Sequence, residues 1–381
     1  MDIKTYVNRW FEESNYFMTK QFYSQIHLTR ACEYSCDHCY FKEIPGKPNT
    51  HLNINVIKKI IDDTKITSRK LGLIPRVDFT GGDPLLHPDF FSIAQYTASQ
   101  NIPFGLKGNP DFLLDSDIRK ELKKLNISSI SLSLDGLEKI QDNLRGQGSF
   151  NKTISCIGIL KEEGFVVKVH STVSRFNIDQ LLPILFFFVN NRFIIDNWTW
   201  SRFWTINDVN DMISDQQIDR SFELIIDAYS KLLSKGDFFY SNSNGDLVPR
   251  IILGFKEHLW FPYLYSKGFI SNDIADNIIT STNSVNCTAT KHVYIIDSNG
   301  EVYKCRKIIE SRIGNIISDP FEIIINSDTA ILFNNLKDHS KCGSCFLFNG
   351  CGGCAAISLA KKKSVFERDP DCRFQYYSNL R

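Results

Sequence analysis

Three cysteines near the start of the chain are the residues best suited to chemistry. Cys32, Cys36 and Cys39 follow the spacing Cys-x3-Cys-x2-Cys. Three thiolates on one loop can hold an iron–sulfur cluster, because its irons prefer sulfur ligands. Three ligands leave one iron of a cubane cluster open to a small molecule. Zinc is the alternative, but a structural zinc site closes with four ligands, and the nearest further candidate, His38, lies between two of the cysteines.

A second set of cysteines lies in the C-terminal part of the chain. Its members are Cys287, Cys305, Cys342, Cys345, Cys351, Cys354 and Cys372. The chain has 11 cysteines in all, an odd number that argues against a complete disulfide framework and favours metal ligation. The paired Cys-x2-Cys units from 342 to 354 also fit a zinc ribbon, which stays open as an alternative. Cys156 lies alone in an apolar stretch and is expected to be a small buried hydrophobic residue.

The bulk composition excludes several classes of protein. At 381 residues with 43% apolar content, the chain has room for two domains or for one barrel with an added module. A net charge of +1 gives no reason to expect binding to nucleic acid or to an anionic membrane. The start of the chain has no apolar signal segment, and the longest apolar run, 181–189, contains a proline and is too short to span a bilayer. We therefore expect a cytoplasmic protein.

The elements that must position the first cysteines alternate regularly between strands and helices. Apolar segments rich in Val, Ile and Phe predict strands at Ser24–Leu28, Arg76–Phe79, Pro103–Leu106, Ser129–Leu134, Val166–Val173 and Ile194–Arg202. Amphipathic segments predict helices at Ile54–Leu71, Phe90–Gln100, Ser116–Leu125, Phe150–Glu163 and Ile178–Val189. This alternation indicates an α/β fold with a partial (β/α)6 TIM-like barrel, whose functional residues collect at the C-terminal ends of the strands.

The rest of the chain departs from this alternation. We expect an N-terminal segment over 1–23, the barrel over 24–205, a helical connection over 206–284 and a cysteine-rich module over 285–381. Within the last module, Val293–Ile296 and Val302–Lys304 flank Asn299-Gly300, a pair that favours a tight hairpin turn. The aromatic strand around Trp198 and Trp200 either packs beneath the barrel, the more common use of such residues, or lines a site at its mouth.

Gly81-Gly82-Asp83 follows the second predicted strand. Glycines let a backbone approach a ligand closely, and a carboxylate can accept hydrogen bonds from an ammonium group. The alternative is a turn that simply ends the strand, because Gly-Gly-Asp-Pro is good turn chemistry.

The cysteine loop resembles the signature of the radical S-adenosylmethionine superfamily, with the same spacing, a preceding strand and an aromatic residue, His38, before the last cysteine. The resemblance implies that Cys32, Cys36 and Cys39 hold a 4Fe-4S cluster. It also implies that the open iron binds the methionine part of S-adenosylmethionine, whose cleavage gives a 5′-deoxyadenosyl radical. Gly81, Gly82 and Asp83 stand where the family has Gly-Gly-Glu, which contacts the methionine amino group. His38 and Tyr40 flank the last cysteine and would lie beside the cofactor.

A later stretch is similar to peptide-modifying members of that superfamily. Asp135-Gly136 ends the fourth predicted strand, and Arg145-Gly146 and Ser149-Phe150 follow it. The resemblance implies that Ser133 and Arg145 bind the amino acid end of the cofactor and that Ser171, Thr172 and Asn177 lie near its ribose. A surface ion pair is the alternative for Arg145, and a simple turn is the alternative for Asp135. The segment 106–109 departs from the family pattern and is assigned no role.

The C-terminal cysteines resemble the SPASM domain, which carries auxiliary iron–sulfur clusters, except that the spacing from Cys351 to Cys354 is one residue short. The resemblance implies one 4Fe-4S cluster on Cys342, Cys345, Cys351 and Cys372, and another on Cys287, Cys305 and Cys354. The second set has three thiolates, so it either keeps an open iron or takes another ligand such as His292.

Together these resemblances imply a radical enzyme that oxidatively modifies side chains of a ribosomally made peptide, with crosslinking as the expected modification. The implied partners are a precursor peptide and a reducing electron donor such as flavodoxin or ferredoxin. Residues 1–23 are too few for a leader-binding domain, so recognition of the peptide is expected either from the core of the enzyme or from a separate leader-binding protein. A sulfatase-maturating type of protein oxidase, a radical enzyme for a small molecule and a non-catalytic electron carrier remain alternatives. The general base is not identified, although Asp208 and Asp211 follow the barrel.

Overall fold

Six parallel strands form the centre of the fold. The computed structural model describes residues 1–42, 50–280 and 292–374. The strands are β1 (Gln21–Thr29), β2 (Ile74–Gly81), β3 (Phe104–Lys107), β4 (Ser129–Ser133), β5 (Val167–Val173) and β6 (Ile195–Arg202). Each pairs in parallel with the next, from β1 to β6. This sheet confirms the predicted partial barrel, and every predicted strand is present.

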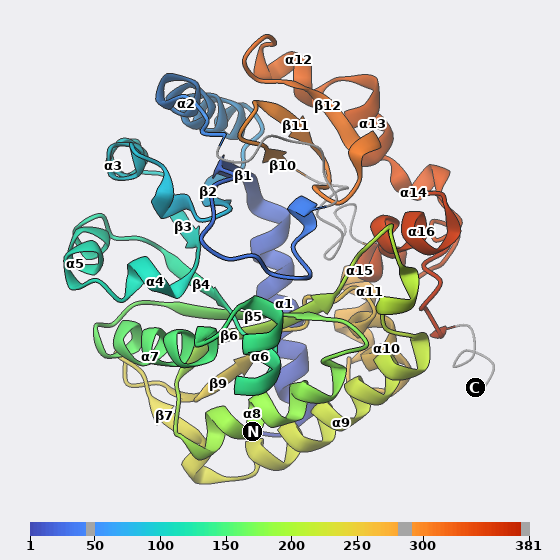
Figure 1. Ribbon diagram of the computed structural model, residues 1–381. Helices are drawn as coiled ribbons and strands as arrows, with labels where there is room; N and C mark the ends of the chain where they lie inside the picture. Colours follow the sequence, from blue (N-terminus) through green and yellow to red (C-terminus); the bar gives the residue numbers. More distant parts are fainter. Residues whose placement is uncertain (43–49, 281–291, 375–381) are drawn as a thin grey trace.

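Helices surround the outer face of this sheet, as Figure 1 shows for α2, α3, α5, α7 and α8. The helices of the first half are α1 (Ile3–Lys20), α2 (Ile54–Lys70), α3 (Phe90–Ser99), α4 (Pro110–Leu113), α5 (Ser116–Lys124), α6 (Glu138–Arg145), α7 (Ser149–Glu162) and α8 (Leu181–Asn190). Those of the second half are α9 (Asp215–Leu233), α10 (Trp260–Ser266), α11 (Asn272–Thr280), α12 (Phe321–Ile325), α13 (Asp328–Asn334), α14 (Leu336–His339), α15 (Phe348–Cys351) and α16 (Ala355–Lys362).

Helix α2 illustrates why these segments fold as they do. The Asn53 side chain caps its start by accepting a hydrogen bond from the Asn55 N–H. Its buried residues, Ile57, Ile60, Ile61, Thr64 and Ser68, recur at helical spacing on one face. This face packs on the outside of the sheet, where the Ser24 and Thr64 hydroxyls lie 2.8 Å apart.

Successive side chains along a barrel strand point alternately towards the surrounding helices and towards the inside of the barrel. On β5, Val167, Val169, Ser171 and Val173 are buried towards the helices, while Lys168, His170 and Thr172 are half-buried and face the inside of the barrel. Trp198 and Trp200 on β6 are fully buried. Trp198 packs edge-on against Phe188 of α8, and Trp200 packs on Phe222 of α9. These tryptophans pack beneath the helices and do not line the mouth of the barrel.

The sheet continues beyond the six strands at both edges. Strand β10 (Val293–Ile296) pairs in parallel with β1, and β11 (Glu301–Tyr303) and β12 (Arg312–Asn315) follow in antiparallel order. The expected hairpin at Asn299-Gly300 is confirmed, with Gly300 in a positive-φ conformation. The predicted boundary at residue 285 lies outside the described residues. The C-terminal chain thus shares one sheet with the barrel.

The expectation of a purely helical connection over 206–284 is wrong. Strand β9 (Ile251–Leu253) pairs in parallel with β6, and β7 (Phe239–Ser241) forms a hairpin with β8 (Leu247–Pro249). Strands of three residues carry too little hydrophobic periodicity to be predicted.

Helix α1 was not predicted either. Its residues lie in the N-terminal segment 1–23, for which no element was predicted. Asp2 caps the helix, and the Tyr6 hydroxyl donates to the Leu253 carbonyl at 2.7 Å. Phe11 stacks on Phe255 with ring centroids 5.9 Å apart. The helix therefore covers the added strand β9.

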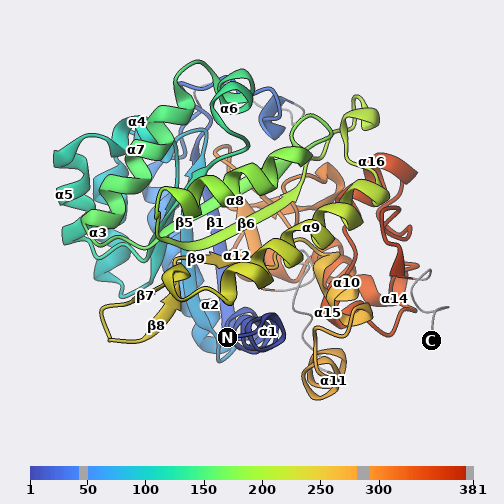
Figure 2. The same ribbon diagram turned by 90° about the horizontal axis from the view of Figure 1, so that it is seen from below.

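Helices α14 and α16 lie across the molecule from α3 and α5, as both views show (Figures 1 and 2). Part of this region has a small core of its own, which includes Trp204, Met212, Ile308 and Phe333. The Trp204 indole donates to the Ala356 carbonyl at 3.0 Å, which ties the end of β6 to α16. Among the described helices, none combines the length and apolar composition needed to cross a membrane.

Candidate active site

The first cysteine group, Cys32, Cys36 and Cys39, lies on the loop that follows β1, at the C-terminal edge of the sheet. Cys32 is exposed, Cys36 is buried and Cys39 is half-buried. Burial raises the pKa of the Cys32 and Cys36 thiols, and each is raised further by the charges of neighbouring thiols of the group. The structure therefore brings the three thiols within electrostatic reach of one another.

The glycines after β2 hold this loop in place. A Cβ atom on Gly81 would lie 2.1 Å from the Thr29 carbonyl oxygen, and one on Gly82 would lie 2.0 Å from that of Ala31. The Gly82 and Asp83 N–H groups donate to the same two carbonyls at 2.8 and 2.7 Å. The close approach that glycine allows is thus made by the cysteine loop itself, where sequence reasoning expected a ligand.

Asp83 is buried beside the first cysteine group. Its two carboxylate oxygens accept from the N–H groups of Leu85 and Asn109, both at 3.0 Å. Burial raises the pKa of Asp83 to about 6, against the lowering effect of these two N–H groups. The Asn109 side chain donates to the Cys32 sulfur at 3.3 Å. Asn109 was assigned no role from the sequence, because it stands in a segment that departs from the family pattern.

Arg145 lies against a buried carboxylate. Its Nε donates to Asp135 Oδ2 at 2.5 Å, and Nη1 lies 3.7 Å from the Cys36 sulfur. His38 Nε2 lies 3.1 Å from the same Asp135 oxygen, and Thr172 N donates to the other oxygen at 2.7 Å. Burial alone would raise the pKa of Asp135, but the charges of Arg145 and His38 hold it well below its usual range. Asp135 is therefore an organising anion beside the cysteine loop, and the alternatives of a simple turn and of a surface ion pair are both wrong.

Two of the residues expected near the ribose, Ser171 and Asn177, make hydrogen bonds within the protein. Ser171 points to the helix side of β5, donates to the Leu134 carbonyl at 2.5 Å and accepts from the Trp198 indole. The Asn177 amide donates to the carbonyls of Asp135 and Thr172 and accepts from Ser174 N. Ser171 thus ties β5 to its neighbours and Asn177 holds the turn after β5, while their contact with a cofactor stays a prediction.

Other predicted residues remain on the inside of the barrel. Ser133 ends β4 and is half-buried, its partner on β5 is His170, and Thr172 lies two residues further along β5. The Tyr40 hydroxyl lies 3.4 Å from His27 Nδ1. The guanidinium of Arg306 lies over the Tyr40 ring, 4.5 Å from its centre. This contact joins the first cysteine loop to the residue that follows Cys305.

The C-terminal cysteines divide into two groups. The second cysteine group is Cys342, Cys345, Cys351 and Cys372. Burial raises the pKa of Cys342, Cys351 and Cys372, and the charges of other thiols in the group raise each of these three further. The third cysteine group is Cys305 and Cys354, and burial followed by the charge of Cys354 raises the pKa of Cys305. Cys287 lies outside the described residues. The division of these cysteines between two clusters, which the resemblance implied, stays a prediction.

His258 is a site residue that sequence reasoning missed. Its Nδ1 lies 3.2 Å from the Cys351 carbonyl oxygen, so this nitrogen carries the proton. The ring also hydrogen-bonds the Cys354 side chain, and this bond holds the pKa of Cys354 below its usual range even though burial would raise it. His292, the ligand considered from the sequence, stacks on Phe22 with ring centroids 6.2 Å apart. Short-range spacing gives no signal for His258, which comes from a distant turn.

A buried ion cluster lies beneath both C-terminal groups. Arg202, at the end of β6, donates to Glu257, Asp369 and Asp371 at distances from 2.7 to 2.9 Å. Asp369 accepts from Cys354 N at 2.9 Å, and its own N–H donates to the Cys342 sulfur at 3.4 Å. Arg202 therefore connects the barrel to a member of each group.

These donor sets fit iron–sulfur clusters. Among the described residues, no three His, Cys, Asp or Glu side chains converge closely enough for a single metal ion. Each cysteine of a cubane binds a different iron, so its sulfurs need not converge on one point. The sulfurs of Cys32, Cys36 and Cys342 also have N–H donors, which are the outer contacts that tune such clusters.

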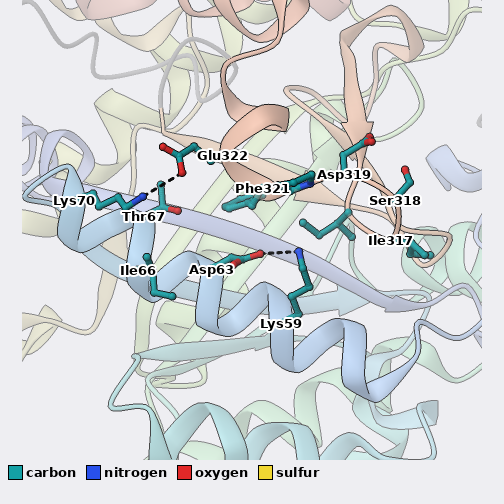
Figure 3. Close-up of a pocket in the computed structure, with 12 residues that line it drawn as sticks. Lys59, Asp63, Ile66, Thr67, Lys70, Ile317, Ser318, Asp319, Phe321 and Glu322 are labelled. Carbon is teal, nitrogen blue, oxygen red and sulfur yellow. Dashed lines mark hydrogen bonds and ion pairs between the residues drawn. The ribbon is translucent and has the colours of Figure 1, made fainter.

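A surface groove of about 340 Å³ lies apart from these residues. Figure 3 shows it between α2 and the segment that leads into α12, with ion pairs Lys59–Asp63 and Lys70–Glu322. None of the cysteines and none of the expected cofactor-binding residues lines it.

Comparison with known proteins agrees with this geometry. The family described as the radical SAM superfamily matches residues 26–188, and the SPASM iron–sulfur cluster-binding domain matches residues 287–347. An AdoMet-dependent heme synthase of Methanosarcina barkeri is 23% identical over 354 residues, covering 91% of this chain and 95% of the relative. Mycofactocin maturase MftC of Mycobacterium tuberculosis is 25% identical over 358 residues, covering 91% of this chain and 81% of the relative.

Solved structures share the fold. Streptococcus suis SuiB bound to precursor peptide SuiA superposes with a TM-score of 0.69 at 17% identity, over 97% of this chain and 79% of SuiB. Native anSMEcpe with bound AdoMet and Cp18Cys peptide gives a TM-score of 0.69 at 19% identity, over 94% of this chain and 95% of that chain. The protein is thus an enzyme of the radical SAM superfamily, with a radical SAM domain and a SPASM domain that imply 4Fe-4S clusters and S-adenosylmethionine as cofactors.

Proposed function

We propose that this enzyme oxidatively modifies side chains of a ribosomally synthesised peptide, and that the modification is a crosslink. The observation that carries the proposal is the presence of two further cysteine groups beside the first, joined to the barrel by Arg202 and by the Tyr40–Arg306 contact. Additional clusters suit a reaction in which the substrate must lose an electron after losing a hydrogen atom.

When bound, S-adenosylmethionine on the first cluster would supply a radical able to take one hydrogen atom from the substrate, and the auxiliary clusters would supply an acceptor for the electron that the substrate then gives up. A proton leaves with that electron, so bond formation removes a pair of hydrogen atoms from the peptide. One of them ends on 5′-deoxyadenosine. The electron that starts the reaction comes from a reduced flavodoxin or ferredoxin, which we propose as the donor.

The residue assignments extend the proposal. The first cysteine group would hold the cluster that binds S-adenosylmethionine, the second would hold one auxiliary cluster, and the third would hold the other together with Cys287. Asp83 would accept from the cofactor's amino group, and Ser133 and Thr172 remain on the side of the barrel that faces it. Arg145 and His38 would act on the first cluster through Asp135 and Cys36.

Support for a peptide substrate comes from the relatives. MftC is a maturase by name, and the SuiB structure contains a precursor peptide. A leader-binding protein supplied separately is a further proposed partner. A small-molecule substrate is the second candidate, favoured by the AdoMet-dependent heme synthase, 95% of which aligns with this chain.

Co-expression tests the proposal. Short peptides encoded beside the gene are expressed with the enzyme and with its Cys32→Ala variant, and their masses are measured. We expect a mass lower by a pair of hydrogen atoms with the native enzyme alone. A peptide whose mass is unchanged by an enzyme that cleaves S-adenosylmethionine would remove the oxidative proposal.

A further inference from the structure

Arg306 is a half-buried arginine that stacks on the first cysteine loop. It directly follows Cys305, and its guanidinium lies over the Tyr40 ring, 4.5 Å from the ring centre. Stacking on an aromatic face leaves the N–H groups at the edge of a guanidinium able to donate. Within residues 1–42, 50–280 and 292–374, Arg306 forms no ion pair and donates no hydrogen bond. Its donors are therefore available to a ligand.

A neighbouring arginine in the same arrangement has a counter-ion. The guanidinium of Arg30 lies over the ring of Phe41, the next residue of the loop, at 4.7 Å, and it also pairs with Asp297. The nearby carboxylates also serve other cations, namely Arg76 and Lys107 at Asp78, Arg145 at Asp135, and Arg202 at Glu257. None of these carboxylates neutralises Arg306.

A chain of hydrogen bonds inside the barrel fixes the direction of the Tyr40 hydroxyl. The chain starts at Lys107, whose ammonium group can only donate. Its nitrogen pairs with Asp78 at 3.1 Å and donates to Gln25 Oε1 at 3.2 Å. The Gln25 amide is thereby held with its oxygen towards Lys107 and its nitrogen towards His27.

The ring of His27 passes this direction on to Tyr40. Gln25 Nε2 lies 3.1 Å from His27 Nε2, and an amide nitrogen can only donate, so His27 Nε2 is the acceptor. Burial lowers the pKa of His27 to about 3, so the neutral ring carries a single N–H, on Nδ1. Nδ1 lies 3.4 Å from the Tyr40 hydroxyl and donates to its oxygen. The Tyr40 proton therefore points away from His27.

Tyr40 and Arg306 together present hydrogen-bond donors without an acceptor. Among the described residues, the Tyr40 hydroxyl has no hydrogen-bond partner besides His27. Tyr40 follows Cys39 and Arg306 follows Cys305, so the pair lies where the loop of the first cysteine group meets that of the third. A carboxylate matches such a pair, because it offers two acceptor oxygens and the charge opposite to that of a guanidinium.

We propose that Tyr40 and Arg306 bind a carboxylate group of the substrate. The guanidinium supplies the charge, and the hydroxyl supplies a hydrogen bond whose direction is set by Gln25 and His27. The nature of the molecule that carries this carboxylate rests on the proposed function: in a peptide it is an acidic side chain or the C-terminus.

Protection of Arg306 from phenylglyoxal tests the site. The reconstituted, oxygen-protected holoenzyme is saturated with S-adenosylmethionine, and modification is followed by mass spectrometry. The probe is propane-1,2,3-tricarboxylate, and the control is its triamide at equal ionic strength. We expect the tricarboxylate to slow modification of Arg306 about tenfold at ten times its half-protecting concentration. Modification of Arg69, an exposed arginine of α2, should be unchanged. Equal slowing by both probes or at both arginines, or no slowing at all, overturns the proposal.

Two other acceptors for Arg306 would give different results. If Arg306 serves S-adenosylmethionine, the cofactor alone protects it fully and the tricarboxylate adds nothing. If Arg306 serves the clusters, Arg306→Met shifts their reduction potentials but binds radiolabelled tricarboxylate as the native enzyme does in equilibrium dialysis. Either result contradicts the proposal, which predicts that Arg306→Met binds the tricarboxylate at least about tenfold more weakly.

A hydroxyl deletion tests the contribution of Tyr40. Tyr40→Phe should weaken tricarboxylate binding about tenfold, because a hydrogen bond to a charged group is lost. The matched control is Tyr96→Phe, which removes a hydroxyl that bonds Asp62 on the outer helices and should leave binding unchanged. Equal binding by the two variants would contradict the assignment of Tyr40.

A double variant tests the direction of the hydrogen bond. Gln25→Leu frees the His27 ring to accept from Tyr40, while Lys107 keeps its pair with Asp78. Gln25→Leu should therefore weaken tricarboxylate binding, by at most as much as Tyr40→Phe does. In the Tyr40→Phe background it should have no further effect. Additive losses, with iron content unchanged, would contradict the chain from Lys107 to Tyr40.

Synthetic peptides identify the source of the carboxylate and separate this inference from the proposed function. One pair is acetyl-Ala-Asp-Ala-amide and its Asn counterpart, and the other is acetyl-Ala-Ala-Ala with a free or an amidated C-terminus. Protection of Arg306 by the Asp peptide alone assigns a side chain, and protection by the free C-terminus alone assigns the chain end. Protection by the tricarboxylate without either peptide upholds the site but contradicts a peptide substrate.

Discussion

At the scale of single residues, the molecule depends on charges buried among a few partners. Arg202 is 2% exposed and holds three carboxylates of its own. Lys361 adds a second cation at Asp371, at 2.6 Å. An isolated surface ion pair contributes little, but a buried charge left without its partner is costly.

Replacing Arg202 with methionine should therefore destabilise the protein by about 3–5 kcal/mol, because buried carboxylates lose their main counter-ion. Thermal unfolding measures the loss, and iron content reports on the cysteine groups that Asp369 contacts. The matched control is Lys341→Met, which breaks an exposed pair with Glu367 and should cost at most about 1 kcal/mol. Equal effects of the two substitutions would contradict a buried cluster.

His258 offers a second residue-scale prediction. With Nδ1 protonated towards the Cys351 carbonyl, the ring can approach a Cys354 thiolate only by donating from Nε2, which makes it a cation. A cation beside a cluster favours its reduced form. His258→Leu should lower the reduction potential of one auxiliary cluster in an EPR-monitored titration. His339→Leu, an exposed histidine on α14, should leave all potentials as they are, and a shift common to both variants would refute the contact.

Lys256 makes stability depend on pH. Its folded-state pKa is lowered to about 7 from an ordinary 10.5, so between these values the unfolded chain binds more protons and stability rises with pH. Lys256→Met removes this burden, so we expect a higher melting temperature than that of the native protein at pH 6, with a gain that shrinks towards pH 10. Calorimetry over that range checks it, with Lys362→Met as the control. A gain independent of pH would mean that the amine is not crowded by charge.

At the scale of elements, the turn at the end of β2 packs directly against the backbone that leads into the cysteine loop. Gly82→Ala would force a Cβ atom to within 2.0 Å of the Ala31 carbonyl oxygen, and backbone cannot yield as a side chain can. We expect the variant to lose iron from the first cysteine group. Gly158→Ala is the matched control, because nothing lies within 4 Å of its Cβ on α7, and it should be neutral or slightly stabilising. Full iron content in Gly82→Ala would show that the loop tolerates displacement.

The hydrophobic pattern of each element explains which parts of the fold the sequence could predict. Strands and helices of the barrel were predictable because their hydrophobic periods repeat over long segments. The outward direction of the Ser171 side chain could have been predicted, because Ser171 alternates in phase with Val169 and Val173 and shares their face of the strand. Asn109 and His258 could not, because they reach the cysteines only through contacts between distant segments.

At the scale of the whole molecule, a single ten-stranded sheet joins the two cysteine-bearing parts. β10 lies beside β1, so the strand that leads into the first cysteine loop is flanked by the strand that leads towards Cys305. The resemblance implied a division of the cysteines into groups, but this shared sheet was not predicted, because no local pattern shows which strands pair across the length of the chain.

The central claim is that the first cysteine group supports cleavage of S-adenosylmethionine. The most direct measurement is the yield of 5′-deoxyadenosine after the reconstituted, oxygen-protected enzyme is reduced with dithionite in the presence of S-adenosylmethionine. We expect product from the native enzyme and from Cys156→Ala, whose thiol is buried away from every cysteine group, and none from Cys36→Ala. No product from a native enzyme with its full iron content, or equal product from Cys36→Ala, would contradict the account.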